Sequence, residues 1–101
     1  NKEVTLQRLQ QIKKAGFILK PNDPDIKPLF EQIKSSFNAK GIEVFLASKS
    51  ASMIGIEGVE FEWMCENVDF LVSLGGDGTL LSLVRRSYGY NKPILGINAG
   101  N

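Results

Sequence analysis

Short apolar-rich runs alternate with amphipathic stretches along this chain, which predicts strands alternating with helices. The runs at residues 16–19, 42–46 and 70–74 are too short for helices and predict strands, and a fourth strand is expected over residues 93–98. Residues 70–74 are nearly all apolar, so this strand should lie in the centre of a sheet.

One helix is predicted from an apolar stripe at helical spacing over residues 29–37. Asp23 or Asp25 can cap it by accepting a backbone hydrogen bond, and the position of Pro28 favours Asp25. Gly41 is expected to end this helix, because a left-handed backbone costs little at glycine.

A second helix is predicted over residues 79–86, with Leu80, Leu83 and Val84 facing inward. Gly89 should stop it, and Tyr88 and Tyr90 should pack around its end.

Three further segments give weaker patterns. Residues 1–15 form an amphipathic helix or a frayed lead-in, and residues 47–58, rich in Ser and Gly, are expected to be a surface loop or a mobile segment. Within residues 60–66, Phe61, Trp63 and Met64 are candidate core residues, and Trp63 should pack rather than stack on a ligand.

The order of these elements predicts the fold class. A strand, a helix and a strand within about thirty residues form a β-α-β unit, which implies parallel strands joined by a right-handed crossover. We therefore expect an α/β fold, an open and mainly parallel sheet with flanking helices. With 101 residues, the chain holds at most one domain.

The composition of the chain excludes several kinds of catalytic and metal site. The chain has no His, which excludes Ser-His-Asp and Cys-His nucleophiles and His-ligated zinc sites. A net charge of +1 argues against a strongly basic nucleic-acid binder, and no apolar run is long enough for a membrane helix. The single cysteine, Cys65, cannot form an internal disulfide, which favours the reducing cytoplasm. Its acidic and apolar neighbours predict a buried, inert thiol with a raised pKa.

The Gly-rich sequence Gly75-Gly76-Asp77-Gly78-Thr79 is the segment that carries chemistry. It joins a predicted central strand to a helix at the carboxyl edge of a parallel sheet, where ligands of such folds bind. Its glycines allow positive φ and a close approach, and the free N–H groups of the helix favour an anion such as a nucleotide phosphate. The segment has neither the Lys of a Walker loop nor the glycine spacing of the dinucleotide fingerprint.

Asp77 needs its own explanation, because a carboxylate repels the phosphate that such a turn binds. It can act as a general base for an attacking hydroxyl or as a ligand of magnesium carried with a nucleotide. It can equally cap the helix, with Thr79 as an alternative cap. Asn98 and Gly100, at the end of the fourth strand, can face the same crevice or simply form a turn.

The sequence GGDGTLL at residues 75–81, followed by PILGINAG at residues 93–100, resembles the N-terminal domain of bacterial NAD kinases. The sequence KPNDP at residues 20–24 is similar to the opening turn of that family, so the resemblance covers about residues 16–101. GGDGT is shared with diacylglycerol and sphingosine kinases, whereas the Gly-Ile-Asn block separates NAD kinases from them.

This resemblance implies a Rossmann-like nucleotide-binding domain over residues 16–101 that transfers the γ-phosphoryl group of ATP, or of polyphosphate, to NAD. The acceptor is the 2′-hydroxyl of the adenosine ribose, and the product is NADP. Asp77 matches the proposed base, and Gly76, Gly78 and Thr79 match the backbone that meets the phosphates. Gly75 and Asn98 join them as cofactor-binding candidates.

The resemblance also implies the surroundings of the reaction. Magnesium would arrive with ATP, so no metal site of the protein's own is expected. The full-length enzyme would be a cytoplasmic homo-oligomer, dimer or tetramer, with no nucleic-acid or membrane partner.

Several features of the family are not in this sequence. A Leu-Gly-Phe continuation, a later Asn-Glu pair and a C-terminal β domain complete the NAD site in NAD kinases, so these 101 residues are expected to be an N-terminal fragment that is inactive alone. Two alternatives stay open, a lipid kinase catalytic domain and a non-catalytic nucleotide-binding module in which Asp77 is only a cap.

Overall fold

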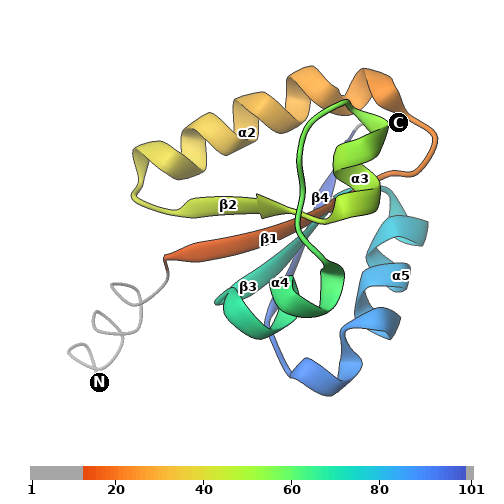
Figure 1. Cartoon of the computed structure of the whole chain (residues 1–101). Helices are drawn as coiled ribbons and strands as arrows, with labels where there is room; N and C mark the ends of the chain where they lie inside the picture. Colours follow the sequence, from red (N-terminus) through yellow and green to blue (C-terminus); the bar gives the residue numbers. More distant parts are fainter. Residues whose placement is uncertain (1–12, 100–101) are drawn as a thin grey trace.

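A computed structural model describes residues 13–99 of the chain (Figure 1). Its strands are β1 (Lys14–Leu19), β2 (Glu43–Leu46), β3 (Phe70–Gly75) and β4 (Ile94–Asn98). Its helices are η1 (Pro24–Ile26), α2 (Lys27–Ala39), α3 (Ser48–Met53), α4 (Phe61–Asn67), α5 (Asp77–Arg86) and η2 (Tyr88–Tyr90), where η marks a 3-10 helix. The lead-in expected over residues 1–15 lies outside the described residues up to residue 12, and residues 14 and 15 belong to β1.

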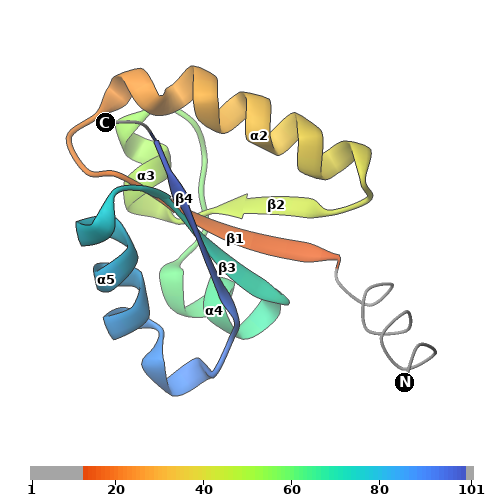
Figure 2. The same ribbon diagram turned by 180° about the vertical axis from the view of Figure 1, so that it is seen from behind.

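All four strands are parallel and lie in the order β2-β1-β3-β4, which confirms the predicted open α/β sheet with β3 in its interior. Helix α2 covers one face, and α4 and α5 cover the other (Figures 1 and 2). Successive side chains of a strand point to opposite faces of the sheet, so each strand contributes to the packed core on both faces. Phe17 and Leu74 pack in the core under α2, whereas Ile18 and Leu71 pack against α4 and α5.

The start of α2 differs from the prediction. A 3-10 turn precedes the helix, Ile26 occupies the N-cap position, and no side chain caps either element, so the predicted caps at Asp23 and Asp25 are wrong. The turn moves the helix start beyond both carboxylates. The other end is as predicted, because Gly41 follows the helix with a left-handed φ of 81°.

Residues 47–58 are not a surface loop, because residues 48–53 form α3. Ala51 is fully buried and Ile54 is nearly so, and both pack into the core beneath α2. The Ser48 N–H donates to the Val59 carbonyl, and the Val59 N–H donates to the Leu46 carbonyl, which ties both ends of the segment to β2. Packing therefore overrides the weak helix propensity of Ser and Gly.

Helix α4 buries Phe61 and Met64, as predicted, but not Trp63. The indole of Trp63 is 43% exposed and meets the Phe45 ring edge-on, with the ring centroids 5.4 Å apart. Trp63 thus packs on a neighbouring ring at the surface rather than in the core.

Helix α5 packs mainly against β3 and buries only part of the face that was predicted to point inward. Leu83 is buried and Leu80 is partly buried, but Val84 is 43% exposed, contrary to the prediction. Tyr88 is exposed because the η2 turn carries it away from the helix end, whereas Tyr90 packs on the α4 core. Asn91, not Gly89, adopts the left-handed backbone before β4, with a φ of 55°.

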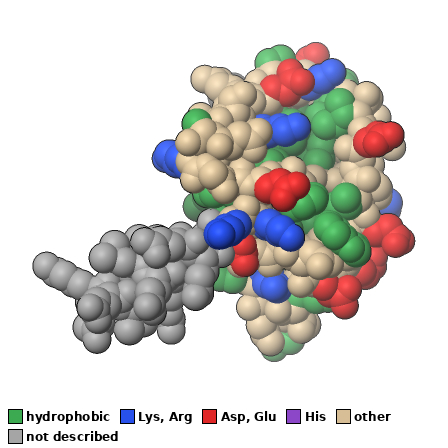
Figure 3. Space-filling model, turned by 60° about the vertical axis from the view of Figure 1, so that its left-hand side comes forward, with side chains coloured by type: hydrophobic (Ala, Val, Ile, Leu, Met, Phe, Trp, Pro, Cys, Tyr) green, Lys and Arg blue, Asp and Glu red, His purple; other side chains and the backbone are tan. Residues whose placement is uncertain are grey.

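The described surface mixes its charges. On the face in Figure 3, Lys and Arg side chains are interspersed with Asp, Glu and hydrophobic side chains. None of the helices within residues 13–99 has the length and hydropathy to cross a membrane.

Candidate functional site

The order of the strands marks one edge of the sheet as the place for a ligand. The chain leaves β1 toward β2 on one side and later returns to β3 on its other side. The carboxyl ends of β1 and β3 therefore form the topological switch point at which open α/β sheets bind ligands. The Gly-rich turn follows β3 at this point, and the Lys20 N–H after β1 donates to the Leu74 carbonyl of β3 at 2.8 Å.

The glycines of the turn do not serve the purpose predicted for them. Positive φ among the described glycines occurs at Gly41 and Gly55, so the predicted positive φ in the turn is wrong. Gly75 permits a close approach, because a Cβ there would lie 2.6 Å from the Thr79 Oγ1 and 2.9 Å from the Lys20 Cβ. A Cβ at Gly76 or Gly78 would meet nothing within 4 Å, so these two glycines leave the turn open to a ligand.

Asp77 is the first residue of α5 and is exposed. The hypothesis that Asp77 or Thr79 caps the helix is wrong, because Gly76 holds the N-cap position and no side chain forms a cap hydrogen bond. The N–H groups of the first helical turn have no partner within the helix and remain available to an anion.

Asp77 and Asn98 line the same small hollow, of about 80 Å³, together with Gly75 and Gly76. Asn98 reaches this place because it pairs with Gly75 in the β3–β4 register, and the next residue, Ala99, donates its N–H to the Gly75 carbonyl. The predicted site residues therefore do come together. Gly100 lies outside the described residues.

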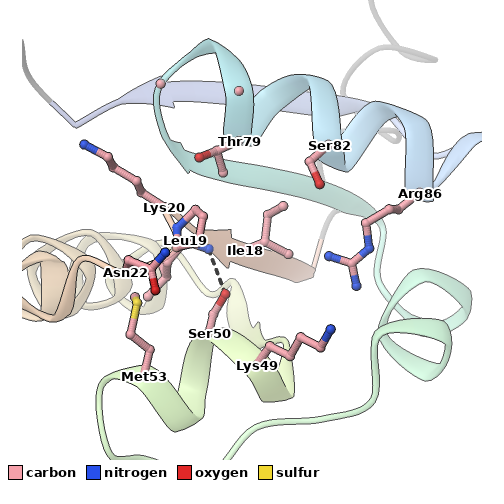
Figure 4. Close-up of a pocket in the computed structure, with 13 residues that line it drawn as sticks. Ile18, Leu19, Lys20, Asn22, Lys49, Ser50, Met53, Thr79, Ser82 and Arg86 are labelled. Carbon is pink, nitrogen blue, oxygen red and sulfur yellow. Dashed lines mark hydrogen bonds between the residues drawn. The ribbon is translucent and has the colours of Figure 1, made fainter.

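A larger cavity, of about 720 Å³, opens on the other side of the turn (Figure 4). Its walls come from three places: residues 18–22, which are the end of β1 and the segment after it; α3; and the turn with α5. Helix α3 contributes Lys49, Ser50 and Met53, and the turn with α5 contributes Gly76, Gly78, Thr79, Ser82 and Arg86. Three cationic side chains, Lys20, Lys49 and Arg86, line the cavity, and no Asp or Glu does. The Gly-rich turn thus separates a carboxylate-bearing hollow from a cationic cavity.

The cavity walls are held by specific contacts. The Ser50 Oγ accepts a hydrogen bond from the Leu19 N–H at 2.9 Å, and the Met53 Sδ accepts one from the Asp23 N–H at 3.3 Å, so α3 is fixed to the end of β1. The guanidinium carbon of Arg86 lies 4.1 Å from the centre of the Phe61 ring, which fixes this cation against α4.

Sequence reasoning missed most of the cavity wall. Thr79, Ser82 and Arg86 recur at helical spacing and could have been identified as one polar face of α5. Lys49 gave no signal, because its segment had no helical pattern and its position depends on α3 packing onto β1.

Cys65 takes no part in either hollow. It is buried in α4, and burial raises the pKa of its thiol, with Arg86 acting in the opposite direction. The described part of the chain also brings no three Cys, Asp or Glu side chains together in a group that could hold a metal ion.

Residues 15–101 match the family model of the ATP-NAD kinase N-terminal domain. The chain belongs to this family. The match covers both strands at the switch point and the whole Gly-rich turn, which agrees with the resemblance seen in the sequence.

Individual relatives share the name NAD kinase. The chain is 54% identical to the NAD kinase of Wolinella succinogenes over 96% of its length, and 52% identical to that of Sulfurimonas denitrificans over 89%. It is 48% identical to the NAD kinase of Helicobacter hepaticus over 88%. These matches cover 33%, 32% and 30% of the relatives, so the chain spans about a third of their length.

Proposed function

We propose that the protein containing this chain is an NAD kinase, which transfers a phosphoryl group from ATP or polyphosphate to the 2′-hydroxyl of the adenosine ribose of NAD. The observation that carries this proposal is the position of the Gly-rich turn between two unlike hollows. Asp77 lies on one side, where a hydroxyl can be deprotonated, and Lys20, Lys49 and Arg86 lie on the other, where phosphates are attracted.

The chemistry follows from this division. The acceptor hydroxyl lies beside Asp77, and the terminal phosphate of the donor meets the N–H groups at the start of α5. The ribose oxygen forms a bond to this phosphorus while the bond from phosphorus to the leaving phosphate oxygen breaks. Asp77 accepts the hydroxyl proton, and the shortened donor leaves with the negative charge.

The remaining partners of the reaction follow from the same proposal. Magnesium would come with the donor phosphates and would neutralise part of their charge. A C-terminal domain would complete the NAD site, consistent with relatives about three times as long. The full-length enzyme would be a cytoplasmic homo-oligomer.

The proposal is tested by replacing Asp77 with Asn in the full-length protein. The amide keeps the size of the side chain but does not accept the proton, so we expect kcat for NADP formation to fall by about 10²–10⁴-fold, the usual contribution of a general base. The melting temperature and the affinity for ATP should stay unchanged.

Asp25→Asn is the matched control, because this exposed carboxylate lies in η1 and lines neither hollow. It should retain full turnover. Unchanged turnover in Asp77→Asn would remove the base from the proposal, and a full-length protein that forms no NADP from NAD with either donor would overturn the function.

A further inference from the structure

The cationic cavity extends well beyond the Gly-rich turn. Thr79 and Arg86 are seven residues apart on α5, which is about 10 Å along the helix axis. The cavity wall on α5 is therefore longer than a single phosphate group at the turn needs. The end of the cavity that lies away from the turn is not needed for the proton transfer at Asp77, yet it carries the cations of Lys49 and Arg86.

One face of α5 connects the two ends of the cavity. Thr79, Ser82 and Arg86 lie at positions i, i+3 and i+7, and Figure 4 shows their polar ends turned into the cavity. Thr79 is only 7% exposed, and its hydroxyl makes no hydrogen bond to another described residue. Donor groups at three distances from the turn suit a linear ligand with acceptor oxygens along its length.

The charges at the far end are not compensated by the protein. The ammonium group of Lys49 on α3 faces Arg86 across the cavity (Figure 4). Neither side chain forms an ion pair with a carboxylate of residues 13–99. Phe61 holds the Arg86 guanidinium in place, and the hydrogen bond from the Leu19 N–H to Ser50 holds α3, the helix that carries Lys49.

We propose that Lys49 and Arg86 bind the part of a linear phosphoanhydride chain that lies remote from the transferred phosphoryl group. They thereby set the affinity for the phosphoryl donor. This assignment rests on the proposed function, and the ligand chemistry is common to a nucleoside triphosphate and inorganic polyphosphate. Both residues contact the donor away from the reacting atoms, so they should act on donor binding and not on the chemical step.

The test uses the full-length protein with Lys49→Met and Arg86→Met, which keep most of the side-chain length and remove the charge. Calorimetric titration with inorganic tripolyphosphate, without NAD, should give a Kd about tenfold higher for each variant, the loss typical of a charged hydrogen bond. The KM for the donor that the enzyme uses, ATP or polyphosphate, should rise by a similar factor. The kcat and the KM for NAD should not change.

Arg85→Met is the matched control. Arg85 is the neighbouring cation on α5 and lies beside Arg86 at the surface, but it does not line the cavity. It changes the net charge equally and should leave the tripolyphosphate Kd unchanged. Arg86→Lys should restore part of the lost affinity.

The outcomes separate this assignment from the proposed function. An unchanged Kd and donor KM in both Lys49→Met and Arg86→Met would overturn the assignment even if NADP is formed, and so would an equal loss in Arg85→Met. If the protein forms no NADP but loses tripolyphosphate binding in these two variants alone, the phosphate-chain site stands and the proposed function falls. Lys49 is an exposed residue of α3, so its variant remains informative if Arg86→Met destabilises the fold by losing the Phe61 contact.

Discussion

The three glycines of the Gly-rich turn have different structural roles. Gly75 lies where β1, β3 and α5 meet, and its missing Cβ leaves room for the Thr79 and Lys20 side chains. Gly76 and Gly78 border open space, and both line the cationic cavity. The first glycine is therefore needed for the fold, and the other two for access of a ligand.

This difference predicts opposite results for alanine substitutions. Gly75→Ala should lower the free energy of unfolding by about 1–3 kcal/mol, because the new methyl group would lie 2.6 Å from the Thr79 Oγ1. Gly78→Ala should leave it unchanged or raise it by up to about 1 kcal/mol, since the position is helical and uncrowded. Urea denaturation of the full-length variants measures both changes.

The same pair separates folding from binding. Gly78→Ala adds a methyl group to the cavity wall, so we expect a raised KM for the phosphoryl donor in a protein of undiminished stability. Equal stability of the two variants, or an unchanged donor KM in Gly78→Ala, would contradict these roles.

At the scale of single residues, the sequence predicted the Gly-rich turn but not the structural role of each residue in it. A Gly-rich string after an apolar strand is a local signal, and it correctly predicted a turn between β3 and α5. The role of Gly75 depends on Lys20, which is 55 positions away in the sequence. A local sequence pattern does not reveal that these two residues are in contact. Asp77 is not the cap, because the helix begins at Asp77 itself, two residues before the predicted start at residue 79.

Among the elements, α3 connects the fold to the candidate site. Its Ala51 packs into the core, its Ser50 binds the end of β1, and its Lys49 lines the cavity. Six residues form no stable helix on their own, so these contacts maintain it.

Ser50→Ala should therefore loosen one wall of the cavity. The substitution leaves the Leu19 N–H without its acceptor, and we expect a loss of about 1–3 kcal/mol in the free energy of unfolding. Hydrogen exchange of the Leu19 amide should be faster. Ser52→Ala, an exposed position on the same helix, should change stability by less than about 0.5 kcal/mol. If Leu19 exchanges equally in both variants, the Ser50 hydrogen bond does not hold α3.

The sequence predicted most elements, because the buried strands and α2 carry regular apolar patterns. The prediction failed where tertiary contacts determine which residues are buried and which segments are helical. Val84 has the correct helical spacing for burial, but the elements packed around α5 leave it 43% exposed. The α3 segment has no regular pattern at all, and its two buried residues, Ala51 and Ile54, are too few to reveal a helix.

On the scale of the whole molecule, the two hollows beside the Gly-rich turn differ greatly in volume. The cationic cavity, at about 720 Å³, is within the roughly 300–1,000 Å³ typical of ligand pockets. The hollow beside Asp77, at about 80 Å³, is far below that range and cannot enclose a dinucleotide. Under the proposed function, the acceptor side therefore needs walls from outside the described residues, whereas the donor side already has the volume of a ligand pocket.

The isolated 101-residue chain should accordingly bind a phosphate chain but not catalyse the reaction. Provided that circular dichroism shows it folded, we expect inorganic tripolyphosphate to bind with a Kd within about tenfold of that of the full-length protein, because the cationic residues are all present. NADP formation from NAD, ATP and magnesium should stay at background, because the acceptor ribose is not held against Asp77, and lost positioning removes a large part of a rate enhancement. Measurable NADP formation by this chain would show that the small hollow is sufficient for the acceptor, and absent tripolyphosphate binding would show that the cationic cavity also needs further walls.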